Sequence, residues 1–269
     1  MYKSIETILV DIPTIRPHQL SVTTMRIQTL VLVKITTTDG FIGWGEATTI
    51  GGLNYGEESP ESVKANIDTY FAPLLTSVKE LNVAQTLKLI RKNINGNRFA
   101  KCAIQTALLD IQAKRLGLPI SELLGGRLRD SLPVLWTLAS GDTEKDIAEA
   151  KKMIELKRHK VFKLKIGARP LQQDVDHVIA IKKALGADIS VRVDVNRAWS
   201  ELECIRGIQQ LQDGGIDLIE QPCAIQNTDA LARLTQRFDV AIMADEALTG
   251  PDSAYRIAKS HGADVFAVK

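Results

Sequence analysis

Five charged residues close short apolar runs at a regular spacing in the second half of the chain. They are Lys165, Asp194, Glu220, Asp245 and Lys269, and by subtraction successive members are 29, 26, 25 and 24 positions apart. Segments with helical periodicity lie between the runs, so the spacing is that of one strand–helix unit after another. Repeated this evenly, the pattern predicts a parallel (β/α) barrel, whose active site forms at the carboxyl ends of the strands.

Three carboxylates from successive strands, Asp194, Glu220 and Asp245, are expected to converge at the mouth of this barrel. Like charges held this close raise one another's pKa unless a cation lies between them. Because the donors are all oxygens, Mg²⁺ or Mn²⁺ is favoured over zinc. Any one of these residues alone would be read as an ordinary surface charge, but the regular set predicts a site for a divalent ion.

Lysines lie on either side of the predicted metal site. Lys163 and Lys165 alternate along one strand and therefore share a face, and Lys269 approaches from the far side of the mouth. A lysine near a dication and a second lysine has a lowered pKa and can exchange protons near neutrality. The pattern therefore predicts proton transfer at a carbon beside a carboxylate, with the metal stabilising the enediolate that forms.

The elements that must position these residues can be placed from periodicity and capping signals. Six strands are expected in residues 130–269, and Ser200 with Glu203 three positions later fits a capping box at the start of one helix. A closed barrel of this type needs eight strands, so we expect the chain to be a fragment that lacks two strand–helix units. The helices between the strands are expected at about 143–158, 174–185, 200–211, 228–236 and 252–260.

Residues 1–129 follow a different pattern, with strands first and helices afterwards, which predicts a separate α+β domain. A first strand is expected to give way to a loop at Pro13 and Pro17, and Asp39-Gly40 marks the turn of a hairpin. Ser59 and Pro60 read as the N-cap and first residue of a helix. The three helices are expected at about 59–75, 83–94 and 99–116.

Composition excludes several classes of function. The 34 basic and 32 acidic side chains are interspersed and give a net charge of +2, which argues against a nucleic-acid surface. No run approaches a membrane span and the first residues lack a signal core, so a cytoplasmic location is expected. The three cysteines, Cys102, Cys204 and Cys223, are interpreted as reduced thiols. The four histidines are interpreted as solvated side chains, of which only His18 could touch substrate; they are His18, His159, His177 and His261.

The strand-end motifs together resemble the enolase superfamily, in its muconate-lactonizing subgroup. They are Lys163-x-Lys165, Asp194-x-Asn196, Glu220-Gln221-Pro222, Asp245-Glu246 and the strand-six Lys269. The lysine on strand six separates this subgroup from mandelate-racemase-like members, which use a histidine and an aspartate there. The stretches 11–18, 46–53, 136–142 and 161–167 resemble muconate-lactonizing members nearly residue for residue. The resemblance covers the whole chain.

The resemblance implies an enolase-type barrel with an N-terminal capping domain, and reversible lactonization of cis,cis-muconate to muconolactone during catechol breakdown. By resemblance, Lys165 exchanges the proton at the α-carbon, Lys163 and Lys269 stabilise the anion, and Asp194, Glu220 and Asp245 hold Mn²⁺, with Mg²⁺ as the alternative. Asn196 and Glu246 orient their neighbours, and Ile50 and Tyr55 match positions that line the substrate pocket. Family members form homo-oligomers, and an octamer is expected.

Other functions stay open at this point. Chloromuconate cycloisomerase, o-succinylbenzoate synthase and dipeptide epimerase belong to the same subgroup. The loops near Pro13 and Ile50 argue against the last two but separate the first one poorly. A different class of function is a non-catalytic remnant that binds metal without turnover, against which the retained Lys165 and the three acidic residues argue.

Overall fold

The computed structural model describes residues 2–19, 23–79 and 82–268. The chain divides into two compact units. The first comprises Met1–Arg16 and Met25–Ser131, and the second comprises Pro17–Thr24 and Leu132–Lys269.

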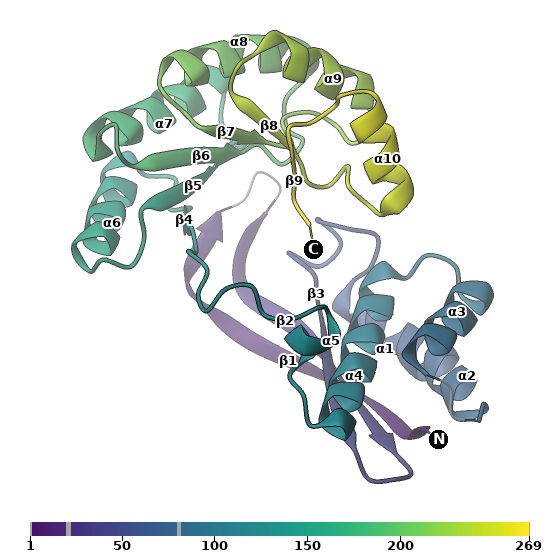
Figure 1. The fold of residues 1–269 in the computed structure, drawn as a ribbon. Coiled ribbons are helices and arrows are strands. Elements are labelled where there is room, and N and C mark those ends of the chain that lie inside the picture. Colours follow the sequence, from purple (N-terminus) through teal and green to yellow (C-terminus); the bar gives the residue numbers. More distant parts are fainter. Residues whose placement is uncertain (1, 20–22, 80–81, 269) are drawn as a thin grey trace. The chain divides into compact units, whose positions relative to one another are not determined.

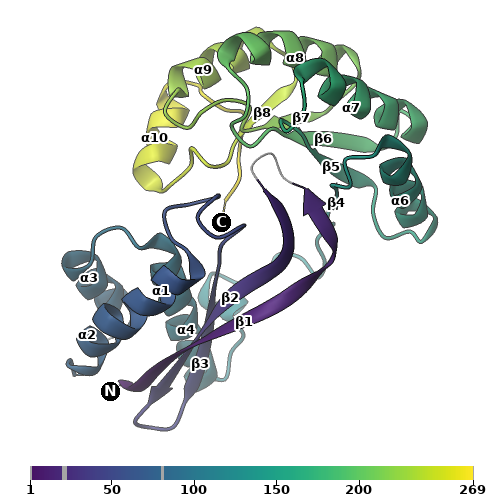
Figure 2. The ribbon, with the colours of Figure 1, turned by 180° about the vertical axis from the view of Figure 1, so that it is seen from behind.

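The first unit contains a three-stranded sheet in the order β1-β2-β3 and a set of helices (Figure 2). The strands β2 and β3 pair antiparallel around the Asp39-Gly40 turn, as the hairpin signal predicts. The elements are β1 (Tyr2–Gln19), β2 (Thr24–Thr37), β3 (Ile42–Thr48), α1 (Pro60–Asn66), the π-helical turn η1 (Ile67–Phe71), α2 (Ala72–Thr76), α3 (Val83–Asn93), α4 (Arg98–Leu116) and α5 (Ile120–Leu123).

Helix α4 packs closely against strand β3 because two glycines remove the side chains between them. A Cβ on Gly43 would lie 2.2 Å from the Ala107 carbonyl oxygen, and one on Gly45 would lie 1.9 Å from that of Ala103. No side chain fits in that space. The backbones therefore meet directly, and the buried face of β2 completes the core of this unit.

One sequence expectation for this unit is wrong, and a second is confirmed only in part. Strand β1 does not end at Pro13 but continues through Pro17, because it lies at the edge of the sheet, where a residue without an N–H group removes no ladder hydrogen bond on the open side. The expected helix from Ser59 does begin with a capping box, but it is interrupted by η1 just before Pro73. The wider turn accommodates a proline that cannot donate an i→i−4 hydrogen bond.

The second unit alternates strands and helices around a parallel sheet of six strands in the described part of the chain, in the order β4-β5-β6-β7-β8-β9 (Figure 1). The helices α6 to α10 form an arc along the convex side of this sheet. The elements are β4 (Trp136–Leu138), α6 (Thr143–Glu155), β5 (Val161–Lys165), α7 (Leu171–Leu185), β6 (Ser190–Asp194), α8 (Glu201–Asp213), β7 (Leu218–Glu220), α9 (Thr228–Arg237), β8 (Ala241–Ala244), α10 (Pro251–Lys259) and β9 (Val265–Phe266).

The alternation of side chains along the strands separates the hydrophobic core from the functional face. In β5, Phe162 and Leu164 are fully buried and belong to the core between the sheet and the helices. The period of two turns Lys163 and Lys165 to the other face, toward the barrel interior. The same strand thus supplies both packing and chemistry.

No helix in residues 2–19, 23–79 and 82–268 is long and apolar enough to cross a membrane.

Candidate active site and metal centre

Three buried carboxylates meet at the carboxyl ends of β6, β7 and β8. Asp194, Glu220 and Asp245 each offer an oxygen, and these oxygens all lie within 4.8 Å of one another. The side chains are well shielded, since the residues are 0, 5 and 5 % exposed, respectively. The parallel register explains the convergence: Asp194 is paired with Glu220, and Asp245 follows the end of the next strand. The three acidic residues predicted from their spacing are therefore adjacent.

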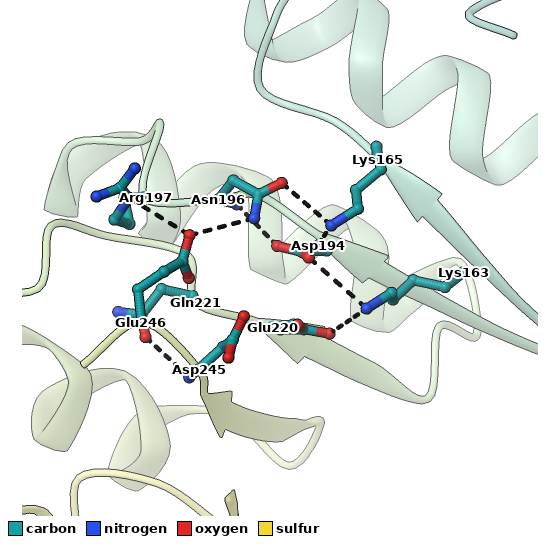
Figure 3. Close-up of polar contacts among 9 residues, drawn as sticks. All are labelled: Lys163, Lys165, Asp194, Asn196, Arg197, Glu220, Gln221, Asp245 and Glu246. Atoms are coloured by element: carbon teal, nitrogen blue, oxygen red, sulfur yellow. Dashed lines mark hydrogen bonds and ion pairs between the residues drawn. The ribbon is translucent and has the colours of Figure 1, made fainter. Parts of the chain in front are cut away.

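Two of the three predicted lysines, Lys163 and Lys165, contact this cluster (Figure 3). Lys165 Nζ donates to Asp194 Oδ2 and lies 3.3 Å from Asn196 Oδ1. Lys163 Nζ donates to Glu220 Oε2 at 2.9 Å and lies 3.7 Å from Asp194 Oδ2. The pairing of β5 with β6 sets Lys165 beside Asp194 in register. Two ammonium groups therefore face three carboxylates in a largely buried site.

The carboxyl groups titrate differently because their surroundings differ. Burial alone would raise the pKa of Asp194, but the charges of Lys165 and Lys163 outweigh it and hold this pKa below the usual value. Burial, with the negative charge of Asp194, raises the pKa of Glu220 despite its contact with Lys163. Burial and Asp194 also raise the pKa of Glu246. Without a cation, this cluster therefore resists full ionisation.

The cluster fits a hard divalent ion. An ion of the size of Mg²⁺ lies about 2.1 Å from its oxygens and separates opposite ligands by about 4.2 Å. The three carboxylate oxygens lie within 4.8 Å of one another, so small side-chain movements are enough to close around such an ion. The donor set consists of carboxylates alone, which matches Mg²⁺ or Mn²⁺ better than zinc. A dication would also balance the charge of these buried carboxylates.

A second set of contacts supports the cluster from the β6–α8 and β8–α10 loops. The Asn196 backbone N–H donates to Asp194 Oδ1 at 2.9 Å, and its Nδ2 donates to Glu246 Oε1 at 3.2 Å. Arg197 Nε lies 3.4 Å from the same Glu246 oxygen. Asn196 thus contacts Lys165, Asp194 and Glu246 at once, as Figure 3 shows. The neighbours that were expected to orient the site are close enough to do so.

Gln221 lies within the Glu220-Gln221-Pro222 motif, but no sequence signal indicated a role for it. Its side chain is fully buried and bonds to the loop that carries Asp245. A glutamine beside an acidic strand end gives only a weak signal, because its partner lies 24 positions away.

The remaining predicted site residues lie in other parts of the chain. Ile50 and Tyr55 are half-buried and lie in a turn-rich segment of the first unit. His18 lies in β1 rather than in a loop. Lys269 lies outside the described residues.

The expectation that all four histidines are solvated is wrong for His177. This residue is 4 % exposed on the inner side of α7. Its Nδ1 lies 2.7 Å from Thr143 Oγ1, and its Nε2 lies 3.4 Å from the buried carboxylate of Asp146. The polar neighbours in sequence suggested a solvated helix face, but the packing of α6 against α7 covers it.

Comparisons with known families cover most of the chain. Residues 4–125 match the mandelate racemase / muconate lactonizing enzyme N-terminal domain. Residues 145–269 match the enolase C-terminal domain-like family.

Individual relatives and solved structures agree with these families. The chain is 87% identical to muconate cycloisomerase 1 of Acinetobacter baylyi, over 100% of this chain and 73% of that protein. It is 45% identical to a chloromuconate cycloisomerase of Pseudomonas sp. strain P51, over 99% of this chain and 72% of the relative. The crystal structure of muconate lactonizing enzyme from Pseudomonas fluorescens complexed with muconolactone superposes with a TM-score of 0.97 at 55% identity, over 100% of this chain and 72% of that one. The matches confirm the expected enolase-type fold.

Proposed function

Because the chain belongs to the mandelate racemase / muconate lactonizing enzyme family, we propose that it catalyses the reversible conversion of cis,cis-muconate to muconolactone. The observation that carries this proposal is the contact of Lys165 with Asp194 at the edge of the buried carboxylate cluster. This contact supports the proposal because chemistry at a carbon next to a carboxylate requires a proton donor close to a bound cation.

Each site residue has a separate role in the proposed reaction. One substrate carboxylate oxygen forms a C–O bond to the double bond that is conjugated to the other carboxylate. The displaced electron pair moves toward that second carboxylate, and the charge of Lys163 stabilises it. Lys165 Nζ then gives its proton to the α-carbon, and in the reverse direction it removes that proton. Asn196, through its contacts with Lys165 and Asp194, keeps the donor at the mouth of the barrel.

The carboxylates of Asp194, Glu220 and Asp245 would hold the divalent ion, for which we propose Mn²⁺ with Mg²⁺ as an alternative. When bound, the ion supplies Lewis-acid stabilisation of the charge that develops on the substrate carboxylate.

Muconate is favoured over chloromuconate as the substrate. The identity to the Acinetobacter baylyi muconate cycloisomerase is 87%, against 45% to the chloromuconate cycloisomerase. Chloromuconate is the second candidate, because those enzymes match over 99% of this chain.

Further parts of the proposal rest on family resemblance. Ile50 and Tyr55 would contact the substrate, and Lys269 would stabilise the anion together with Lys163. The division into residues 1–129 and 130–269 as capping and barrel domains, a homo-octameric assembly and a cytoplasmic location complete the proposal.

The test is the decay of cis,cis-muconate ultraviolet absorbance in the presence of Mn²⁺. It is run on this chain and on a chimera extended with the corresponding carboxyl-terminal part of the Acinetobacter baylyi relative. Lys165→Ala is expected to lower turnover by about 10²- to 10⁴-fold, because the proton donor is lost. Lys182→Ala, which removes a lysine bonded to the Ala187 and Ile189 carbonyls away from the cluster, serves as the matched control. Muconate left untouched by both wild-type forms, with Mn²⁺ bound, would refute the substrate.

A further inference from the structure

The Gln221 side chain forms a buried bridge between the ends of β7 and β8. We propose that Gln221 is a positioning residue that fixes the metal-binding carboxylate of Asp245. The inference rests on the metal site of the proposed function, and it assigns the geometry of that site to a residue that is not itself a ligand.

The amide of Gln221 is fully engaged on both of its atoms. Oε1 accepts hydrogen bonds from the backbone N–H groups of Asp245 at 2.9 Å and of Ala247 at 3.0 Å. Nε2 donates to the Cys223 carbonyl at 3.1 Å. The residue is 0 % exposed, so water cannot replace these partners. The side chain therefore holds the backbone on both sides of Glu246.

The backbone of Gln221 extends the bridge to a third strand. Its N–H donates to the Met243 carbonyl at 2.9 Å, and its carbonyl accepts from Arg197 N–H at 2.8 Å. One residue thus links the segments that follow β6, β7 and β8, the strands that end in the three carboxylates. Its φ of +36° lies in the left-handed region, which is costly for a residue with a side chain. Such a conformation is expected where the surrounding contacts enforce it.

The hydrogen bond from the Asp245 N–H to Gln221 Oε1 fixes the backbone from which the metal-binding side chain of Asp245 extends. Without the Gln221 amide oxygen, the buried N–H groups of Asp245 and Ala247 lose their acceptor, and this loop must shift to find another. A carboxylate that moves with its backbone no longer presents its oxygen to the ion. Groups that orient metal ligands in this way typically change metal affinity by about 10- to 100-fold when removed.

Gln212 provides a matched control, because its hydrogen bonds lie at the opposite end of β8. Gln212, near the end of α8, also accepts hydrogen bonds from the backbone N–H groups of two consecutive residues, Asp239 at 2.8 Å and Val240 at 2.9 Å. These bonds lie just before β8, whereas those of Gln221 lie just after it. Removal of either glutamine costs two acceptor bonds, but only Gln221 lies beside a predicted metal ligand.

The experiment compares Mn²⁺ binding by this chain and its variants, with electron paramagnetic resonance used to measure free Mn²⁺ and the spectrum of the bound ion. Gln221→Met is expected to weaken Mn²⁺ binding at least about 10-fold and to change the bound-ion spectrum. Gln212→Met is expected to stay within about twofold of the wild type in affinity, although both variants lose thermal stability.

Folding is checked by circular dichroism. If Gln221→Met does not fold, Gln221→Asn replaces it, because the shorter amide stays polar but cannot reach both N–H groups. Equal Mn²⁺ affinity in the wild type and the folded Gln221 variant would overturn the role of Gln221 while leaving the metal site intact. Equal losses in the Gln221 and Gln212 variants would overturn it too, by revealing a general effect of stability. A wild type that does not bind Mn²⁺ would refute the metal site itself.

Discussion

The two ends of the six-stranded sheet differ in the charge of the polar side chains that gather there. At the amino end, polar groups bond to the backbone: Asp264 Oδ2 accepts from Ile242 N–H at 2.8 Å, and Gln212 accepts from two N–H groups before β8. At the carboxyl end, Asp194, Glu220 and Asp245 are buried side by side.

The difference separates stability from function. Each group at the amino end satisfies a backbone donor, so it stabilises the fold without any ligand. The carboxyl end gathers like charges, and Lys163 and Lys165 pair with two of the three carboxylates, those of Glu220 and Asp194. Such a cluster costs folding free energy unless a cation binds, which is expected of a site that was kept for chemistry rather than for packing.

The largest effect is expected at the carboxyl end. Asp245→Asn removes one carboxylate from the cluster and should weaken Mn²⁺ binding about 100-fold or more, with a similar loss of muconate turnover. The melting temperature of the metal-free protein should stay the same or rise, because a buried like charge is removed. Calorimetric Mn²⁺ titration and thermal denaturation in EDTA measure the two quantities. If Asp245→Asn melted at a lower temperature than the wild type in EDTA, the carboxylate cluster would not cost stability.

The opposite outcome is expected at the amino end. Asp264→Ala removes the acceptor of Ile242 N–H and should lower the free energy of unfolding by about 1–2 kcal/mol. Because Asp264 lies at the far end of β8 from the carboxylates, Mn²⁺ affinity should not change. Urea denaturation and Mn²⁺ titration provide the measurements, and Asp264→Asn, which keeps an acceptor oxygen, is the control. Loss of Mn²⁺ affinity in the alanine variant would erase the distinction between the ends.

The pH dependence of stability should reveal the same asymmetry with the smallest amplitude. The raised pKa values of Glu220 and Glu246 favour the folded protein at low pH, and this stability is lost as the pH rises through those values. The lowered pKa of Asp194 acts in the opposite sense and is lost only in stronger acid, so the contributions partly offset. The melting temperature in EDTA should therefore fall as the pH rises above the ordinary glutamate pKa.

Excess Mn²⁺ should reverse that fall, because the ion binds the ionised carboxylates. Glu246→Gln should flatten the curve in EDTA, since one of the two titrating groups is removed. A melting temperature in EDTA that instead rises steadily with pH above the ordinary glutamate pKa would contradict the direction of both pKa shifts.

Much of the second unit could be predicted because its signals are local. The capping box of Ser200 and Glu203 is present as predicted, and the apolar runs became the strands of a parallel sheet. The regular spacing of Asp194, Glu220 and Asp245 predicted their proximity, since parallel strands in register bring successive ends together. Their roles, like those of Lys163 and Lys165, stay predictions until variants are measured.

The order of the elements, the faces of the strands and the residues at the strand ends could be predicted from the sequence, because periods of two and 3.6 are properties of neighbouring positions. The partners of those residues depend on how the elements pack in three dimensions. Pro13 and Pro17 continue a strand because β1 is at a sheet edge. His177 is buried because α6 packs against α7. Gln221 finds its partner 24 residues away because β8 lies beside β7, and no local pattern records that contact.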